Sequence, residues 1–156
     1  MIIDFEAHDE GEWFPFFPSH IDEATGETVW DEPNTDARIR ARSGRFFIQE
    51  RLKSRKRKAE HVFNTKTRAM ERIEYFESLP LDEQQKDNEN WIDFIITGLD
   101  NFKDKKTGKV IECTRENKIK LMQIPSFDRC IAKIQRLIAE SGIRQEEEEQ
   151  KNLPAG

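Results

Sequence analysis

The strongest constraint on the fold lies near the end of the chain, where apolar residues recur with helical spacing. They fall at i, i+3, i+4, i+7, i+10 and i+11, as Phe127, Cys130, Ile131, Ile134, Leu137 and Ile138. This spacing predicts an amphipathic helix whose apolar face is buried. Ser126 is a natural N-cap and Gly142 a natural C-terminal stop, so the helix is expected between these two residues.

The first quarter of the chain predicts strands. Pro15, Pro18 and Pro33 disfavour helix there, and the segment is rich in aromatic residues. The stretch HIDEATGETVW, residues 20–30, predicts a hairpin turning around Thr25–Gly26. RIRAR, residues 38–42, predicts another short strand.

The middle of the chain is less regular. A charged, weakly amphipathic helix is expected from Ser43 to about Glu60. HVFNTKTRAMERIEYF, residues 61–76, fits either a hairpin turning at Asn64 to Thr67 or a loop leading into a short helix. The hairpin is favoured because the second half of this segment is rich in strand-forming residues.

Two further helices precede the last one. The first begins after Pro80, carries an apolar face over residues 91–99 and is expected to close at Gly98. A second Thr-Gly turn follows at Asp104 to Gly108. Thr114 then opens a short helix that Pro125 ends.

These elements predict an α+β fold, with a small β-rich N-terminal part and a helical C-terminal part. Residues 1–36 form an acidic, aromatic arm with a hairpin, and residues 37–142 form the main α+β domain. The tail at 143–156 is strongly acidic and is expected to be disordered. A chain of 156 residues, 35% hydrophobic and 37% charged, suits one compact core with solvated segments.

Charge is strongly segregated along the chain. Residues 1–36 contain 11 acidic residues and no Lys or Arg, whereas residues 37–58 contain 10 basic residues. This basic stripe could neutralise phosphates of a nucleic acid, with Phe46 or Phe47 as a stacking surface. Pairing with the acidic arm of the same chain, or with an acidic partner, is the competing interpretation. The stripe consists of Arg38, Arg40, Arg42, Arg45, Arg51, Lys53, Arg55, Lys56, Arg57 and Lys58.

Catalytic and metal-binding motifs are not found. The chain has no Gly-rich phosphate loop, GxSxG or HExxH sequence, and Cys113 and Cys130 have no CxxC spacing. Asp4, Glu6 and His8 would share one face of a strand and could hold a cation, but an exposed acidic edge is the favoured interpretation. We therefore expect neither an enzyme, nor a metal site, nor a cofactor.

Targeting signals are also not found. No apolar run approaches the ~20 residues that cross a bilayer, and MIIDFEAHDE lacks the charge pattern of a signal peptide. A reduced, soluble, cytoplasmic protein is expected.

The stretch FFPSHIDEATGETVWDEP, residues 16–33, resembles the second half of a WW domain, which binds proline-rich peptides. Trp13 and Trp30 are too close for its two signature tryptophans, and Pro15 and Pro18 flank the segment that should be its central strand. The likeness covers one hairpin only. A WW-like peptide binder is therefore the least favoured function.

A longer resemblance covers about residues 37–140. The segment from Trp91 to Ile134 is similar to the C-terminal part of tail assembly chaperones from long-tailed bacteriophages. In that family an amphipathic helix ends near a glycine, a short turn follows, Thr or Ser caps a helix, and a proline precedes the last helix. The matching segments are 91–99, 104–111, 114–122 and 125–134, and ARIRARS resembles the strand before the helical part.

This resemblance implies a non-enzymatic protein made in the infected cell. Such chaperones bind the tape measure protein, keep it soluble, help to recruit tail-tube subunits and are absent from the mature virion. Many are also made in a longer, frameshifted form. The helices would carry the client surface, and homo-oligomers are left open. The expected partner-binding residues are Trp91, Ile95, Leu99, Phe127, Ile131, Ile134 and Ile138.

Overall fold

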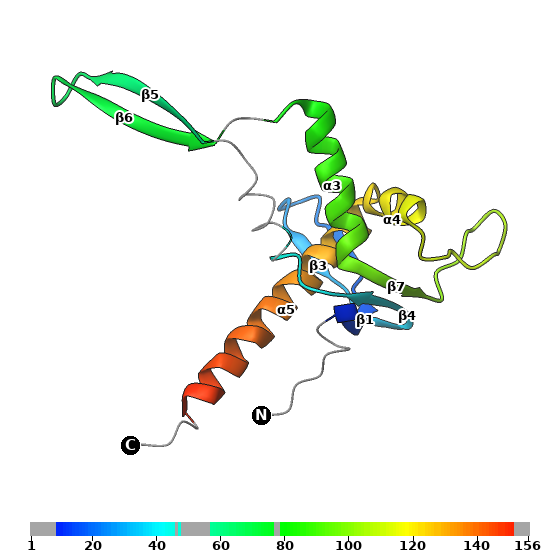
Figure 1. The fold of residues 1–156 in the computed structure, drawn as a ribbon. Helices are drawn as coiled ribbons and strands as arrows, with labels where there is room; N and C mark the ends of the chain where they lie inside the picture. The colour runs from blue at the N-terminus through cyan, green and yellow to red at the C-terminus, as the bar shows by residue number, and fades with distance from the viewer. Residues whose placement is uncertain (1–8, 46, 48–56, 77–78, 152–156) are drawn as a thin grey trace.

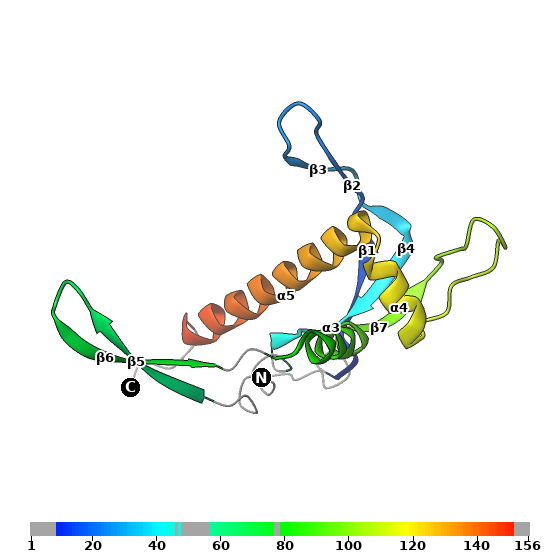
Figure 2. The same cartoon turned by 90° about the horizontal axis from the view of Figure 1, so that it is seen from above.

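The computed structural model describes residues 9–45, 47, 57–76 and 79–151. Strands and hairpins come first and helices follow, so the predicted α+β class is confirmed. Figures 1 and 2 show a body of sheet and helices, from which a long hairpin and the C-terminal half of the last helix project.

A three-stranded antiparallel sheet forms one wall of the body. It consists of β1 (Glu12–Phe16), β4 (Asn34–Ala41) and β7 (Ile96–Asp100), in the order β1-β4-β7. In β4, Ala37, Ile39 and Ala41 are buried and alternate with Arg38 and Arg40, as side chains on successive strand residues point to opposite faces. The predicted strand at 38–42 is therefore confirmed, and one face of the sheet contributes to the core.

Three helices complete the core: α3 (Leu81–Ile95), α4 (Arg115–Met122) and α5 (Pro125–Lys151). The predicted apolar face of α5 is confirmed, because Phe127, Cys130, Ile131 and Ile134 are all at most 2% exposed. These side chains pack with Ile39 of β4 and with apolar residues of α3 and β7. Pro125, not Ser126, begins α5.

The predicted end of α3 is wrong. The helix stops at Ile95 and the chain continues directly into β7, which contains both Gly98 and Leu99. Gly98 instead allows close packing, because a Cβ built on it would lie 3.0 Å from the Trp13 ring and from the Arg40 Cβ. A short apolar run of β-branched residues fits a buried strand as well as a helical face, so periodicity alone misplaced the boundary.

The predicted end of α5 is also wrong. The helix passes through Gly142 and continues to Lys151, so the expected disordered tail begins as helix, and residues 152–156 lie outside the described part. One glycine inside a helix costs only about 1 kcal/mol, and the Glu-rich sequence after it favours helix.

The predicted hairpin around Thr25–Gly26 is confirmed as β2 (Ser19–Ile21) and β3 (Thr28–Trp30). It docks on α5 through Arg129, which donates hydrogen bonds to the Ser19 hydroxyl and carbonyl at 2.7 and 3.2 Å. Trp13 lies in the three-stranded sheet and Trp30 in this separate hairpin, so the three-stranded sheet of a WW domain is not formed.

The favoured hairpin at 61–76 is confirmed and is longer than predicted. β5 (Arg57–Asn64) pairs with β6 (Ala69–Phe76) over their full length. The helix predicted from Ser43 to Glu60 is therefore wrong at 57–60, where the chain is strand, while residues 46 and 48–56 lie outside the described part. Cross-strand pairing overrides the weak helical pattern there.

Three turns share one backbone design and begin at Asp22, Asn64 and Asp104. In each, the carbonyl of this first residue accepts a bond from the N–H four residues later, at 2.7, 2.7 and 2.8 Å. Its side-chain oxygen also accepts the N–H two residues later, at 2.9, 2.9 and 2.8 Å. The fifth residue has positive φ, and it is Gly26, Arg68 or Gly108. The similarity predicted between the two Thr-Gly turns therefore extends to a third.

Candidate binding surface

Most of the predicted partner-binding residues lie inside the body. Ile95, Phe127, Ile131 and Ile134 are buried, and their side chains pack against this chain's own core. Trp91, Leu99 and Ile138 are partly buried around it. The structure brings all seven together in one core, and their role toward a partner stays a prediction.

The largest group of exposed apolar side chains instead lies on the β5–β6 hairpin, which we call the hairpin arm (residues 57–76). Figures 1 and 2 both show the arm extending away from the body. Within the described residues, β5 and β6 form a two-stranded sheet with no third strand. Such a hairpin is only marginally stable in water, so the arm is a surface that a partner would stabilise.

Both faces of the arm carry exposed apolar residues. Phe63 and Met70 are directly opposite one another on one face and are 55% and 62% exposed. Val62, Ile73 and Tyr75 fall on the other face because they occupy the alternate register positions, and each is at least 39% exposed. A cluster of this kind on a projecting element marks a candidate interaction site.

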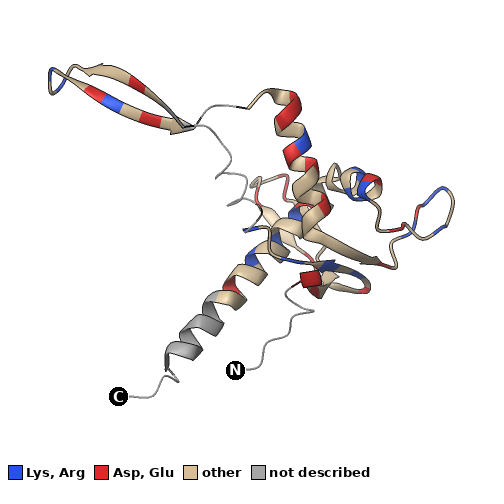
Figure 3. Ribbon diagram, in the orientation of Figure 1, with Lys and Arg blue, Asp and Glu red and all other residues tan. Residues whose placement is uncertain are grey.

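Hydrogen bonds between side chains of the hairpin arm connect its two strands. The Asn64 side-chain amide donates to Glu71 at 2.8 Å, and the Tyr75 hydroxyl donates to Glu60 at 3.1 Å. Figure 3 shows that acidic and basic residues alternate along β6, where Arg72 and Glu74 approach to 3.5 Å. The arm thus presents apolar groups among charges of both signs.

The described part of the predicted basic stripe contacts the same chain. Arg38 pairs with Asp100 at 2.8 Å and Arg40 with Glu10 at 2.9 Å. Arg42 donates to the Phe94 carbonyl at 2.6 Å, and its guanidinium lies 3.9 Å from the centre of that ring. Glu10 belongs to the acidic arm, so the basic stripe pairs at this point with the acidic arm of the same chain, as one of the interpretations from the sequence expected.

The rest of the stripe is more distant from these contacts. Arg45 is exposed, and Arg57 and Lys58 lie in β5. Phe47 packs against Phe94 with ring centres 5.4 Å apart, so it belongs to the body. Several of the residues considered from the sequence lie outside the described part of the chain. They are Phe46, Arg51, Lys53, Arg55 and Lys56 of the basic segment and Asp4, Glu6 and His8 of the possible cation site.

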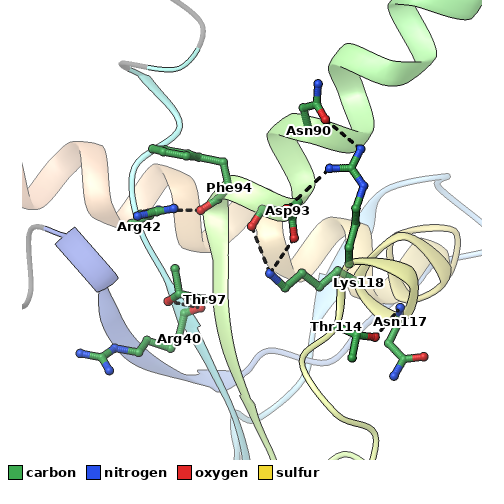
Figure 4. A network of polar contacts seen from close by, with 10 residues as sticks. Arg40, Arg42, Asn90, Asp93, Phe94, Thr97, Thr114, Asn117 and Lys118 are labelled. Carbon is green, nitrogen blue, oxygen red and sulfur yellow. Dashed lines mark hydrogen bonds and ion pairs between the residues drawn. The ribbon is translucent and has the colours of Figure 1, made fainter.

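A polar network joins α3 to α4 and was missed from the sequence (Figure 4). Lys118 is only 7% exposed, and its ammonium donates at 3.1 Å to both the carboxylate and the carbonyl of Asp93. Arg115 lies 3.6 Å from the same carboxylate and donates to Asn90 at 2.8 Å. A buried ammonium needs such a partner. The network therefore fixes α4 on α3. In the sequence, the position of Lys118 among the apolar residues of α4 could have indicated a buried ion pair.

Both cysteines are unsuited to nucleophilic chemistry. Burial raises the pKa of the Cys130 thiol to about 11, although the Phe17 N–H, 3.4 Å from Sγ, partly opposes this rise. Burial also raises the pKa of Cys113. Both thiols therefore stay protonated near neutral pH, where a reactive cysteine must be a thiolate.

In the described residues, no group of three or more His, Cys, Asp or Glu side chains is placed to hold a metal ion. The described helices also include none that combines the length and apolar character needed to cross a membrane. Comparison with protein-family models, curated proteins and solved structures found no match to this chain.

Proposed function

We propose that this chain is a non-enzymatic tail assembly chaperone of a long-tailed bacteriophage. It binds the tape measure protein in the host cytoplasm, keeps it soluble, helps to recruit tail-tube subunits and does not enter the mature virion. The observation that most supports a binding role is the hairpin arm, with exposed apolar side chains on both faces. The family resemblance of residues 91–134 suggests the client.

The arm suits a long helical client on physical grounds. A tape measure protein is largely helical and aggregates through exposed apolar stripes, which a sheet face can cover. Phe63 and Met70 lie side by side, and the flexible methionine side chain is of the kind that adapts to varied partners. The interspersed charges keep the covered client soluble, and weak contacts repeated along a long client strengthen one another.

Nucleic-acid binding is the alternative function, and the contacts of the described residues give it no support. Arg38, Arg40 and Arg42, the first three members of the stripe, already bond to groups of the same chain. Binding of a proline-rich peptide is less supported still, since Trp13 and Trp30 lie in separate sheets.

Co-expression with the tape measure protein tests the proposal. The proposal predicts that a long, coiled-coil-rich tape measure protein is encoded beside this one, and that protein is the client to test. The readouts are client solubility and co-purification. The test variant is Phe63→Ser with Met70→Ser. Its matched control is Val110→Ser with Ile124→Ser, which removes two apolar side chains that are 56% and 48% exposed elsewhere on the chain.

The wild type and the control are expected to hold the client in solution, and the arm variant to lose most of this activity. A client that stays insoluble with wild-type protein would contradict the chaperone function. Full activity of the arm variant would place the client surface elsewhere. Circular dichroism of each variant shows whether its fold is retained.

A further inference from the structure

The free edge of β6 carries a pattern of residues that is complementary to itself. β6 pairs with β5 on one side, and no other described strand pairs with it on the other. In an antiparallel ladder every second residue directs its N–H and C=O away from the partner strand. The outer edge of β6 therefore has unpaired donors and acceptors that a further strand can bond.

The charges on β6 select one register for pairing with a second copy. When two β6 strands run antiparallel with Ile73 opposite Ile73, each Arg72 lies opposite Glu74 of the other copy. Directly opposite residues of an antiparallel ladder both direct their N–H and C=O toward each other or both away, so pairing of two identical strands centres on one residue. Centring on Glu71, Arg72 or Glu74 places like charges opposite each other. Opposite charges across a strand pair stabilise it and like charges destabilise it. Only the Ile73 register brings opposite charges together among these.

The edge of β5 is less suitable. Its complementary register centres on Ala59 and overlaps only residues 57–61, whereas the Ile73 register overlaps residues 70–76 of β6. β5 also begins with two adjacent basic residues, a feature that commonly protects edge strands from pairing. Ile73, which is 47% exposed, gives the β6 pairing an apolar contact at its centre.

We propose that two copies of this chain associate through the β6 edges, with Ile73 on the two-fold axis. The two hairpin arms then form one four-stranded antiparallel sheet in the order β5-β6-β6-β5. A two-fold contact repeats each favourable charge pair, so Arg72 and Glu74 each act twice. Four strands are also stable where two are marginal, which explains how an arm remote from the body stays folded.

This assembly is tested by sedimentation velocity on the full chain, with no client present, so the result is independent of the proposed function. The wild type is expected to dimerise at micromolar concentrations. Arg72→Glu alone and Glu74→Arg alone each turn two attractive pairs into two repulsive ones. Each variant is expected to weaken the dimer by about tenfold or more.

Charge exchange provides the matched control. An equimolar mixture of R72E and E74R chains opposes acidic to basic side chains at both positions, so the dimer is expected to return. The double variant R72E/E74R is expected to dimerise by itself. Both side chains are more than half exposed, so their contact within one strand contributes little to folding.

Three results would overturn the proposal. The first is a wild type that remains monomeric at several hundred micromolar. The second is a dimer that is unaffected by either single substitution, or is lost instead on Lys58→Glu. The third is a mixture of the two single variants that stays monomeric, because the effect of charge would then not depend on this register.

Discussion

At position 68 an arginine occupies the place that glycine holds in the two related turns. Arg68 has a φ of 53°, whereas Gly26 and Gly108 have φ values of 70° and 67°. A side chain in this left-handed region costs about 1 kcal/mol, and glycine adopts it freely. The hairpin arm therefore folds despite a residue that opposes its turn.

Arg68→Gly is expected to stabilise the arm by about 1 kcal/mol. Slower hydrogen exchange of the β5 and β6 amides would measure this gain, since the arm can open without the body unfolding. Lys66→Gly is the matched control, because Lys66 lies in the same turn without positive φ. Equal protection in both variants would contradict the explanation from φ.

Cys130 is expected to make the stability of the body depend on alkaline pH. Burial raises its folded-state pKa from 9.0 to about 11. Below pH 9 the thiol is protonated in both states, and its contribution to stability is fully present. Between pH 9 and 11 the unfolded state ionises first, so this contribution is lost as pH rises.

Urea denaturation at a series of pH values from 8 to 11 checks this expectation. Cys130→Ala is less stable overall because it leaves a cavity, but its free energy of unfolding should fall less steeply with pH than that of the wild type. All other ionisable groups are common to both proteins, so their contributions cancel in the comparison. Parallel slopes for the two proteins would show that Cys130 is not the group responsible.

At the level of elements, α4 is held to α3 by an ion pair between the buried Lys118 and the partly exposed Asp93. Asp93 at the end of α3 accepts from Lys118, which is almost completely buried on α4. The Asp93 carbonyl is a second acceptor for the same ammonium, so the bond joins the helices through both backbone and side chain. Removing one member of such a pair leaves the other charge without compensation.

Asp93→Ala is expected to reduce the free energy of unfolding by about 2 to 3 kcal/mol, since it leaves the Lys118 charge poorly compensated. Arg115→Ala is the control, because Arg115 meets the same carboxylate but is 46% exposed and should cost less than about 1 kcal/mol. Chemical denaturation followed by Trp fluorescence measures both. Equal reductions in the free energy of unfolding for the two variants would mean that the burial of Lys118 does not determine the contribution of this ion pair.

At the scale of the whole molecule, segments far apart in the sequence close one core and leave the arm outside it. β1 and β4 come from the first third of the chain and pair with each other, and β4 also pairs with β7 from the second half. The N-terminal hairpin docks on α5, where the Lys133 ammonium lies 4.7 Å from the Phe17 ring centre and 4.4 Å from that of Trp30. The acidic and basic segments meet in this body, where Arg38, Arg40 and Arg42 of the described basic stripe bond to groups of the same chain.

Sequence reasoning worked best where one element's own pattern decided its structure. The apolar spacing of α5 predicted its buried face, and Thr114 caps α4 through a bond from the Asn117 N–H at 3.3 Å. The alternation of β4 and the turn at Gly26 were likewise local signals. Prediction from the sequence failed at Ile96 to Leu99 and at 57–60. These segments are strands because they pair with β4 and with β6, respectively.

For the candidate binding surface, too, local patterns were informative and tertiary packing was not predictable. The sequence pointed to the apolar faces of the helices, but it could not show that Ile95, Phe127, Ile131 and Ile134 satisfy one another in a shared core. Phe63 and Met70 were visible only as apolar residues in an ambiguous segment. Their exposure depends on the arm lying away from the body (Figure 1).

The sequence by itself determined the α+β class, the buried face of α5, the turns and the separation of charge, because each arises from residues close together in the chain. Tertiary structure alone decided that β7 completes a sheet with β1 and β4, that Lys118 is buried against Asp93, and that no third strand of the described chain pairs with the arm. These outcomes depend on which surfaces meet across long stretches of chain. Local periodicity carries no information about such meetings.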